Sequence, residues 1–120
     1  MMTVAWVPVC PLGRLEPERG VAALVDGVQV AVFRTFGGQL YAIDNFDPVG
    51  RAQVLSRGIV GTRGEVPTVA SPLHKQVYDL RTGERLDGPG EPVRAYPVRC
   101  REGMVEVAVN ASPSTPRSWR

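Results

Sequence analysis

Hydrophobic and polar residues alternate over short stretches of this chain, and Gly, Pro or Asp interrupts them every few residues. Alternation with a period of two is the pattern of a half-buried β-strand, and we find no convincing 3.6-residue period of an amphipathic helix. The chain holds 13 Gly and 11 Pro among its 120 residues, which is typical of short strands joined by many turns. The pattern predicts an all-β domain with roughly nine or ten strands in small packed antiparallel sheets, similar to a sandwich or barrel.

Two hairpins are predicted in the first half of the chain. An Asp-Gly pair at 26–27 separates the apolar runs 21–25 and 28–33. Such a pair favours a tight hairpin because both turn positions adopt positive φ. A Gly-Gly pair at 37–38 leads in the same way to the run 39–43. The three runs are therefore expected to form a meander.

Further strands are expected near the N-terminus and in the second half of the chain. They cover 3–9, 66–70, 76–80, 93–98 and 104–109, the last two forming a final hairpin. The aromatic residues that we expect in the core, on these strands and the earlier ones, include Trp6, Phe33, Tyr41 and Tyr78. Residues 54–61 contain too many glycines and β-branched residues for a useful helix.

The length predicts one domain, covering residues 1–110. The remaining residues, 111–120, are rich in Ser, Pro and Arg and are expected to be a disordered tail. Trp119 lies in this tail and would be exposed unless a partner covers it.

Charge and hydropathy exclude several classes of function. The net charge of +2 is too small to indicate binding to nucleic acid or to an anionic membrane. No apolar run has the length needed to cross a bilayer, and no basic segment precedes an apolar stretch at the N-terminus. We therefore expect a cytoplasmic protein.

The two cysteines, Cys10 and Cys100, match no metal-ligand spacing. A structural disulfide would be unusual in a reducing cytosol, so two small, mostly buried thiols are the favoured interpretation.

Two segments carry the residues of chemical interest. The first contains Asn45, Phe46, Asp47 and Pro48, and the second contains Ser71, Pro72, Leu73, His74 and Lys75. The acceptors in the first segment could bind a hard cation, but they lack the spacing of a Ca²⁺ loop. We therefore favour an Asx-type turn, in which these side chains accept hydrogen bonds from loop N–H groups.

His74 is the only histidine of the chain and could act as a metal ligand or proton donor. A loop histidine held by hydrogen bonds is the favoured interpretation, because one imidazole without partner ligands makes a poor metal site. Ser71 and His74 could form a nucleophile and base, but no Gly-x-Ser-x-Gly elbow surrounds Ser71 and Pro72 follows it directly.

The layout of the two segments resembles the Rieske domain, in which Cys-x-His and Cys-x-x-His loops hold a [2Fe–2S] cluster. In that register Asn45, Asp47 and Ser71 replace three ligands, and only His74 is retained. The resemblance covers about Trp6 to Val109. It implies small antiparallel sheets with the two loops on an inserted subdomain.

The combination of Asn45-x-Asp47-Pro48, the segment 55–61 and Ser71-Pro72-Leu73-His74-Lys75-Gln76 resembles the small subunit of assimilatory NAD(P)H-dependent nitrite reductase. That resemblance implies a subunit without its own cofactor or catalytic residues. Its partner would be a large subunit with FAD, an iron–sulfur cluster and sirohaem, which reduces nitrite to ammonia in nitrogen assimilation. The alternatives are a Rieske-type ferredoxin serving an oxygenase and a stand-alone β-sheet binding module.

The two loops are the candidate contact with a partner. Phe46, Val49 and Leu73 are apolar residues at the predicted tips, and exposed apolar tips ringed by basic residues suit a protein interface. The nearby basic residues are Arg51, Arg57, Arg63 and Lys75. They fit either a docking face for an acidic patch or ordinary solvated charge.

Overall fold

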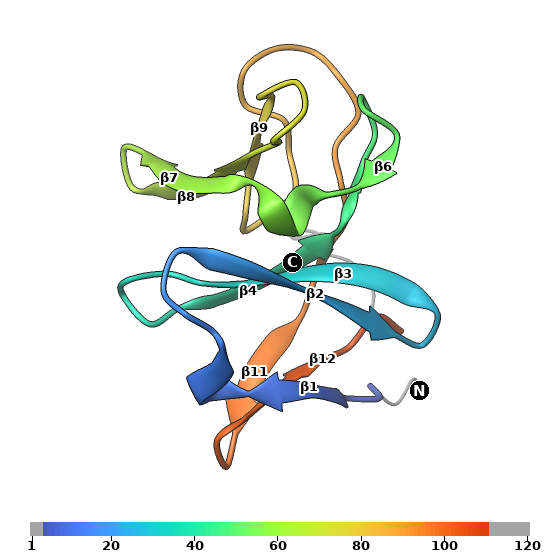
Figure 1. Ribbon diagram of the computed structural model, residues 1–120, viewed down its shortest axis with the longest axis vertical. Helices are drawn as coiled ribbons and strands as arrows, with labels where there is room; N and C mark the ends of the chain where they lie inside the picture. The colour runs from blue at the N-terminus through green and yellow to red at the C-terminus, as the bar shows by residue number, and fades with distance from the viewer. Residues whose placement is uncertain (1–3, 111–120) are drawn as a thin grey trace.

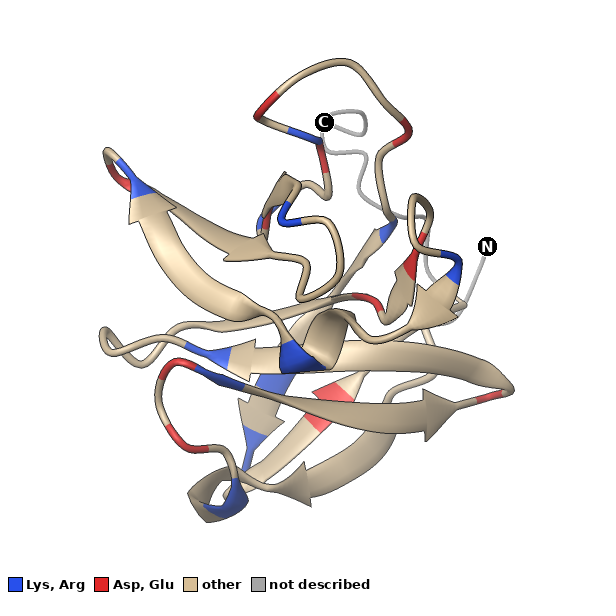
Figure 2. Cartoon of the chain, turned by 45° about the horizontal axis from the view of Figure 1, so that its top comes forward, with Lys and Arg blue, Asp and Glu red and all other residues tan. Residues whose placement is uncertain are grey.

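The structure is a computed structural model that describes residues 4–110. The expected tail, with Trp119, and the first residue of the expected opening strand lie outside the described residues. Within them, no helix is long and apolar enough to span a membrane. Figure 2 shows acidic and basic residues interspersed along the described chain, in keeping with the small net charge.

The described chain consists of short strands and two short 3₁₀ turns. The strands are β1 (Val7–Pro11), β2 (Arg19–Val25), β3 (Val28–Arg34), β4 (Leu40–Asp44), β5 (Phe46–Asp47), β6 (Ala52–Gln53), β7 (Ile59–Arg63), β8 (Val66–Ala70), β9 (Val77–Asp79), β10 (Ala95–Tyr96), β11 (Val98–Arg101) and β12 (Met104–Val107). The turns are η1 (Leu12–Arg14) and η2 (Leu55–Arg57).

The strands form three antiparallel sheets and a small ribbon. The lower sheet has the order β1-β12-β11, the middle sheet β10-β4-β3-β2 and the upper sheet β7-β8-β9, while β5 pairs with β6. Figure 1 shows these sheets stacked along the long axis, with the upper sheet, β6 and their loops at one end. The all-β prediction of small antiparallel sheets is confirmed.

The middle sheet separates two hydrophobic cores. Successive residues of a strand point to opposite faces. Val30 and Val32 accordingly belong to the core beneath the sheet, while Ala31 and Phe33 belong to the core above it. All four are fully buried, so β3 is covered on both faces. This double burial explains why residues 28–33 read as a nearly continuous apolar run.

The two hairpins predicted in the first half are confirmed. Asp26 and Gly27 have φ values of 48° and 82°, and they join β2 to β3 in an unbroken register. The turn between β3 and β4 contains Gly38 at φ 85°. Both turns need residues that tolerate positive φ, and such residues can be recognised in the sequence.

The prediction of one strand over 93–98 is wrong. Ala95 and Tyr96 pair with β4 in the middle sheet, whereas β11 starts at Val98 and pairs with β12 in the lower sheet. Pro97 lies between them and has no N–H to donate to a ladder. The chain therefore changes sheets at this proline.

The buried aromatic residues are mostly as expected. Phe33 and Tyr78 are fully buried, and Tyr41 packs against the upper core. Trp6 differs, because it precedes β1 and is only half-buried. The guanidinium of Arg99 lies over its ring, 4.1 Å from the centroid.

Both cysteines are free, but the prediction that they are mostly buried is wrong. Cys100 is exposed and Cys10 is half-buried. The two residues lie on opposite sides of β12, each in register with Val105. The strand β12 therefore separates them, because they lie on the two outer strands of the lower sheet.

Candidate functional site

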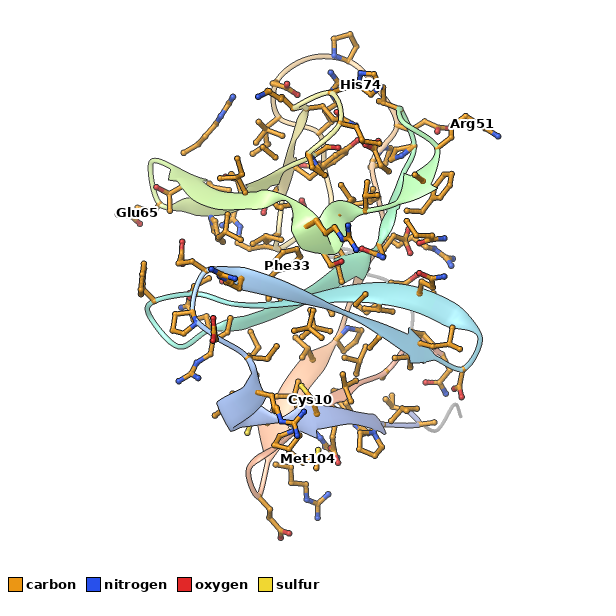
Figure 3. All side chains as sticks on the ribbon, viewed as in Figure 1. Cys10, Phe33, Arg51, Glu65, His74 and Met104 are labelled. Carbon is orange, nitrogen blue, oxygen red and sulfur yellow. The ribbon has the colours of Figure 1, made fainter. Side chains whose placement is uncertain are left out.

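The two predicted loops lie together at the upper end of the molecule. The first loop covers residues 44–50 and the second covers 71–76. Figure 3 shows His74 and Arg51 at this end, far from Cys10 and Met104. The loops touch where Gly50 meets Leu73: a Cβ atom added to Gly50 would lie 2.5 Å from Leu73 Cδ1. Glycine at this position therefore allows the second loop to rest on the first.

A buried carboxylate joins the two loops. Asp47 is fully buried, and its Oδ1 accepts hydrogen bonds from the N–H groups of Val49 (2.8 Å) and Gly50 (3.0 Å). These bonds form the Asx-type turn that the sequence predicts. The Ser71 hydroxyl donates to Oδ2 at 2.5 Å, and Gln76 Nε2 donates to Oδ1 at 2.5 Å. Both loops therefore close on one side chain.

These donors keep Asp47 ionised without a neighbouring cation. Burial alone would raise the pKa of its carboxyl group. Hydrogen bonds from Ser71, from the backbone of Gly50 and Val49 and from Gln76 outweigh burial and hold the pKa of Asp47 below its usual value of 3.8. The carboxylate thus acts as a fixed acceptor for four donors.

Gln76 and Tyr78 complete this network and were missed in the sequence analysis. Gln76 Nε2 also donates to the Tyr78 hydroxyl oxygen at 3.2 Å, and both side chains are buried. Burial raises the pKa of Tyr78, with the negative charge of Asp47 adding to it, so its phenol stays protonated at neutral pH. A signal was available, because Gln76 alternates with Tyr78 and Leu80 and so shares their buried face.

Asn45 ties the first loop to the turn η2. Its Oδ1 accepts from the N–H of Ser56 at 2.7 Å, and its backbone carbonyl accepts from Leu55 at 2.9 Å. The side chain is buried, with 2% exposed. The residue therefore satisfies two N–H groups at the start of η2, although its side chain bonds a residue eleven positions away and does not form an Asx turn.

The structure separates Ser71 from His74. Ser71 is buried and its hydroxyl donates to Asp47, whereas His74 is exposed. Ser71 Oγ also accepts from the N–H of Leu73 at 3.2 Å, which shapes the second loop. Ser71 is therefore a structural residue of the loop pair, and no hydroxyl–imidazole pair is formed.

Apolar side chains are exposed at the end of both loops. Phe46, Val49 and Leu73 are 37%, 45% and 47% exposed, and we call these three residues the apolar tip. Arg51 and Lys75 are exposed in the same two loop regions. Pro72, next to Leu73, is exposed, and Pro48 is half-buried.

Arg57 and Arg63 do not belong to the apolar tip. Arg57 ends η2 and lines a hollow together with residues 18–20. Arg63 ends β7, and its guanidinium donates to the carbonyl of Leu86 at 3.5 Å. The predicted group of four basic residues is therefore divided between two parts of the surface.

The donor atoms at the two loops do not fit a [2Fe–2S] cluster. The four corresponding positions offer an amide, a carboxylate, a hydroxyl and one imidazole, where such a cluster takes two thiolates and two imidazoles. Cys10 and Cys100 lie in the lower sheet, away from the loops. Within residues 4–110, no three His, Cys, Asp or Glu residues gather to hold a metal ion.

Comparison with known proteins identifies relatives over nearly the whole described chain. A model of the Rieske-like [2Fe–2S] domain matches residues 5–108. The NADH nitrite reductase small subunit of Escherichia coli K12 is 37% identical over 103 residues, which are 85% of this chain and 95% of that protein. A ferredoxin subunit of anthranilate 1,2-dioxygenase from Burkholderia cepacia is 36% identical over 105 residues, 87% of this chain and 92% of that protein.

One relative is much longer than this chain. The NAD(P)H nitrite reductase large subunit of Klebsiella oxytoca is 44% identical over 102 residues, which are 85% of this chain. The matched part is 11% of the length of that protein.

A solved structure agrees with the fold. The crystal structure described as the NADH-dependent nitrite reductase small subunit of Mycobacterium tuberculosis superimposes with a TM-score of 0.87 at 43% identity. The match covers 92% of this chain and all of that one.

Proposed function

This chain belongs to the family of Rieske-like [2Fe–2S] domains, and we propose that it serves as the small subunit of a cytosolic NAD(P)H-dependent nitrite reductase. The observation that carries the proposal is the 37% identity to the Escherichia coli small subunit over 95% of that protein. The Mycobacterium tuberculosis structure, matched over its full length, supports the same assignment. In this role the chain takes part in the reduction of nitrite to ammonia without carrying out the chemistry itself.

We propose that the chain holds no cluster and that the Asp47 network stabilises the two loops instead. Support comes from the donor set, because Asn45, Asp47 and Ser71 are committed to hydrogen bonds within the loops. FAD, an iron–sulfur cluster and sirohaem would then belong to the large subunit. The small subunit would contribute shape and contacts.

Iron analysis tests this proposal. The chain, purified after expression in iron-supplied cells, should contain far less than one iron per chain and should lack visible absorption. As a control, the anthranilate dioxygenase ferredoxin subunit should be purified in parallel and analysed for iron. Two irons per chain together with a Rieske-type spectrum would refute the proposal and favour the oxygenase ferredoxin.

The proposed partner is the nitrite reductase large subunit, contacted through the apolar tip. The Klebsiella large subunit contains a segment similar to this chain, so the two parts can occur in one polypeptide. Exposed Phe46, Val49 and Leu73, with Arg51 and Lys75 nearby, offer an apolar centre and a basic rim. Interfaces commonly have such an apolar centre and polar rim.

A charge placed on the apolar tip should weaken the complex. Leu73→Asp is expected to lower affinity for the purified large subunit about tenfold or more, because a buried unpaired carboxylate is costly. The matched control is Leu24→Asp, since Leu24 is 70% exposed on β2 in another part of the molecule. Equal affinities for both variants and the unmodified chain would place the contact elsewhere.

A further inference from the structure

A groove runs along one side of the molecule between the middle and upper sheets. It consists of two adjoining hollows of about 440 and 260 Å³ that share Glu18 as a lining residue. Residues 59–60 of β7 line the first hollow, and residues 61–62 line the second. Four consecutive residues of one strand therefore form a continuous wall. The opposite wall comes from residues 18–20 and the turn at 35–39.

The wall formed by β7 is the open edge of a sheet. In the order β7-β8-β9, β7 has a partner only on the β8 side. Its register with β8 runs without a shift, with Thr62 opposite Pro67. A strand edge of this kind carries main-chain donors and acceptors that can pair with another chain.

The hydrogen bonding of Pro67 shows which groups of β7 face the groove. The Pro67 carbonyl accepts from the N–H of Leu80 at 2.9 Å, so Pro67 directs its main-chain groups toward β9. Thr62 and Pro67 are therefore a non-hydrogen-bonded pair, and the N–H and C=O of Thr62 point away from β8. Val60, two residues earlier, has the same orientation. Both residues thus offer a donor and an acceptor at the open edge.

This edge lacks the usual protection against pairing. Natural edge strands are commonly blocked by proline, by bulges or by charged side chains. The lower sheet shows such protection in β1, which contains Pro8 and a register shift before Cys10. By contrast, β7 contains no proline, its register is regular, and its one charged residue, Arg63, is the last residue of the strand.

Side chains around the groove define the chemistry of a fitting segment. Ile59 is 72% exposed in β7, and Phe36, across the groove, is 82% exposed. Arg57 lies in the first hollow and Glu65 in the second, where Figure 3 shows Glu65 at the end of the β7–β8 hairpin. Both are exposed, and within the described chain neither belongs to an ion pair. Glu18 lines both hollows and adds a carboxylate between them. A complementary segment would place apolar side chains against Ile59 and Phe36, an acidic group near Arg57 and basic groups near Glu18 and Glu65.

β2 is an outer strand of the middle sheet, and only its first residues line the groove. Arg19 and Gly20 line the first hollow. Gly20 packs closely against η2, since an added Cβ would lie 2.5 Å from the carbonyl oxygen of Ser56. The groove therefore leaves room for pairing along β7 and not along β2.

We propose that β7 binds an extended segment of the nitrite reductase large subunit as a fourth strand of the upper sheet. Main-chain bonds to Val60 and Thr62 would supply affinity, while Ile59, Phe36 and the two end charges would select the segment. The site lies apart from the apolar tip and so adds a second contact to the same partner. It rests on the proposed function, because the segment is assigned to that large subunit.

Hydrogen exchange on the unmodified chain tests the pairing directly. In the free chain the amides of Val60 and Thr62 should exchange rapidly, while those of Gly61 and Arg63 are slowed by β8. On addition of purified large subunit, exchange at Val60 and Thr62 should slow at least about tenfold. Unchanged exchange at both amides in a saturated complex would overturn the proposal, even if the apolar tip becomes protected.

A proline variant provides a second test. Thr62→Pro removes the N–H that points into the groove and keeps the hydrogen bonds to β8, so it should weaken binding of the large subunit about tenfold. The control is Thr62→Val, which keeps the N–H and the side-chain shape and should bind as the unmodified chain does. Thermal unfolding of each variant checks that the fold is retained. Equal affinities for a folded Thr62→Pro variant and its control would overturn the inference.

The two proposals can fail separately. If the large subunit does not bind the unmodified chain at all, the proposed function fails, and with it the assignment of the bound segment to the large subunit. If it binds but β7 is unaffected, only the β7 inference fails. Protection of Val60 and Thr62 that depends on the concentration of this chain alone would identify a second copy as the occupant and would also refute it.

Discussion

At the scale of single residues, Asp47 is the centre of the candidate site. A buried charge is normally matched by an opposite charge, yet this carboxylate is surrounded by neutral donors from both loops. Such bonds to a charged acceptor are among the stronger hydrogen bonds in proteins. The geometry of the loop pair therefore depends on this one side chain.

Two substitutions of Asp47 should have different effects. Asp47→Ala leaves four buried donors without an acceptor and should lower the free energy of unfolding by about 3 kcal/mol. Asp47→Asn keeps one oxygen for Val49, Gly50 and Gln76 and can donate to Ser71, so about 1 kcal/mol is expected. Urea denaturation of both variants measures the difference. Equal losses would show that the network contributes little.

The same residue should make stability depend on pH. The folded-state pKa of Asp47 lies below 3.8, so its carboxylate contributes its full stabilisation above the unfolded value. That contribution is lost as the pH falls through the lower, folded-state pKa. Urea titrations between pH 7 and pH 2 should therefore show a steeper loss for the unmodified chain than for Asp47→Asn. Parallel curves would assign the acid sensitivity to other groups.

Some of the site could be predicted from the sequence because its chemistry is local. Asp47 bonds to residues two and three positions ahead, which is the ordinary geometry of an Asx turn. The bonds from Ser71 and Gln76 join residues 24 and 29 positions away. No local pattern encodes these pairings, since they depend on how the upper sheet brings the loops together.

At the scale of elements, tight turns limit which residues the structure tolerates. Gly83 has φ 83°, and a Cβ there would lie 1.9 Å from the carbonyl oxygen of Val93. The Val93 N–H also donates to the Gly83 carbonyl at 2.9 Å. The turn after β9 is thus pressed against the chain segment that leads to β10.

A pair of glycine substitutions separates backbone strain from collision. Gly103→Ala, at φ 80° with open space around it, should lower the free energy of unfolding by about 1 kcal/mol. Gly83→Ala has the same backbone strain plus the collision with Val93, so a loss of about 3 kcal/mol or more is expected. Thermal or urea unfolding of the two variants gives the comparison. Similar losses would mean that the segment at Val93 moves aside easily.

The elements themselves were predictable where a turn is encoded locally. The Asp26–Gly27 hairpin follows from two residues that accept positive φ. The division at Pro97 was missed because Val93–Val98 alternates well enough for one strand, and the sheet each half joins is decided by long-range pairing. The two-residue strands β5 and β6 are too short to produce any alternation.

At the scale of the whole molecule, the two cores share the middle sheet. Val32 and Phe33 are neighbours in β3, yet they pack into the lower and upper core respectively. Neither core can lose its packing without disturbing a strand that also belongs to the other. We therefore expect the described domain to unfold in one cooperative transition.

Substitutions on the two faces of β3 test that expectation. Val32→Ala and Phe33→Leu should each lower the free energy of unfolding by about 1–2 kcal/mol. Hydrogen exchange at Val69 in the upper sheet and Val105 in the lower sheet should report the same loss in each variant. A loss confined to the sheet nearest the substitution would show that the cores unfold independently.

The hydrogen bond between Asp47 and Gln76 affects how readily substitutions in the two loops could supply ligands for a cluster. Replacing Asn45, Asp47 and Ser71 by Cys, His and Cys would, together with His74, supply the donor types of a Rieske cluster. It would also remove one of the two acceptors of the buried Gln76 amide group, which costs about 1–3 kcal/mol. Replacing Asp47 would therefore be destabilising unless Gln76 changed as well. By this reasoning, a stable electron carrier would need more than the three substitutions.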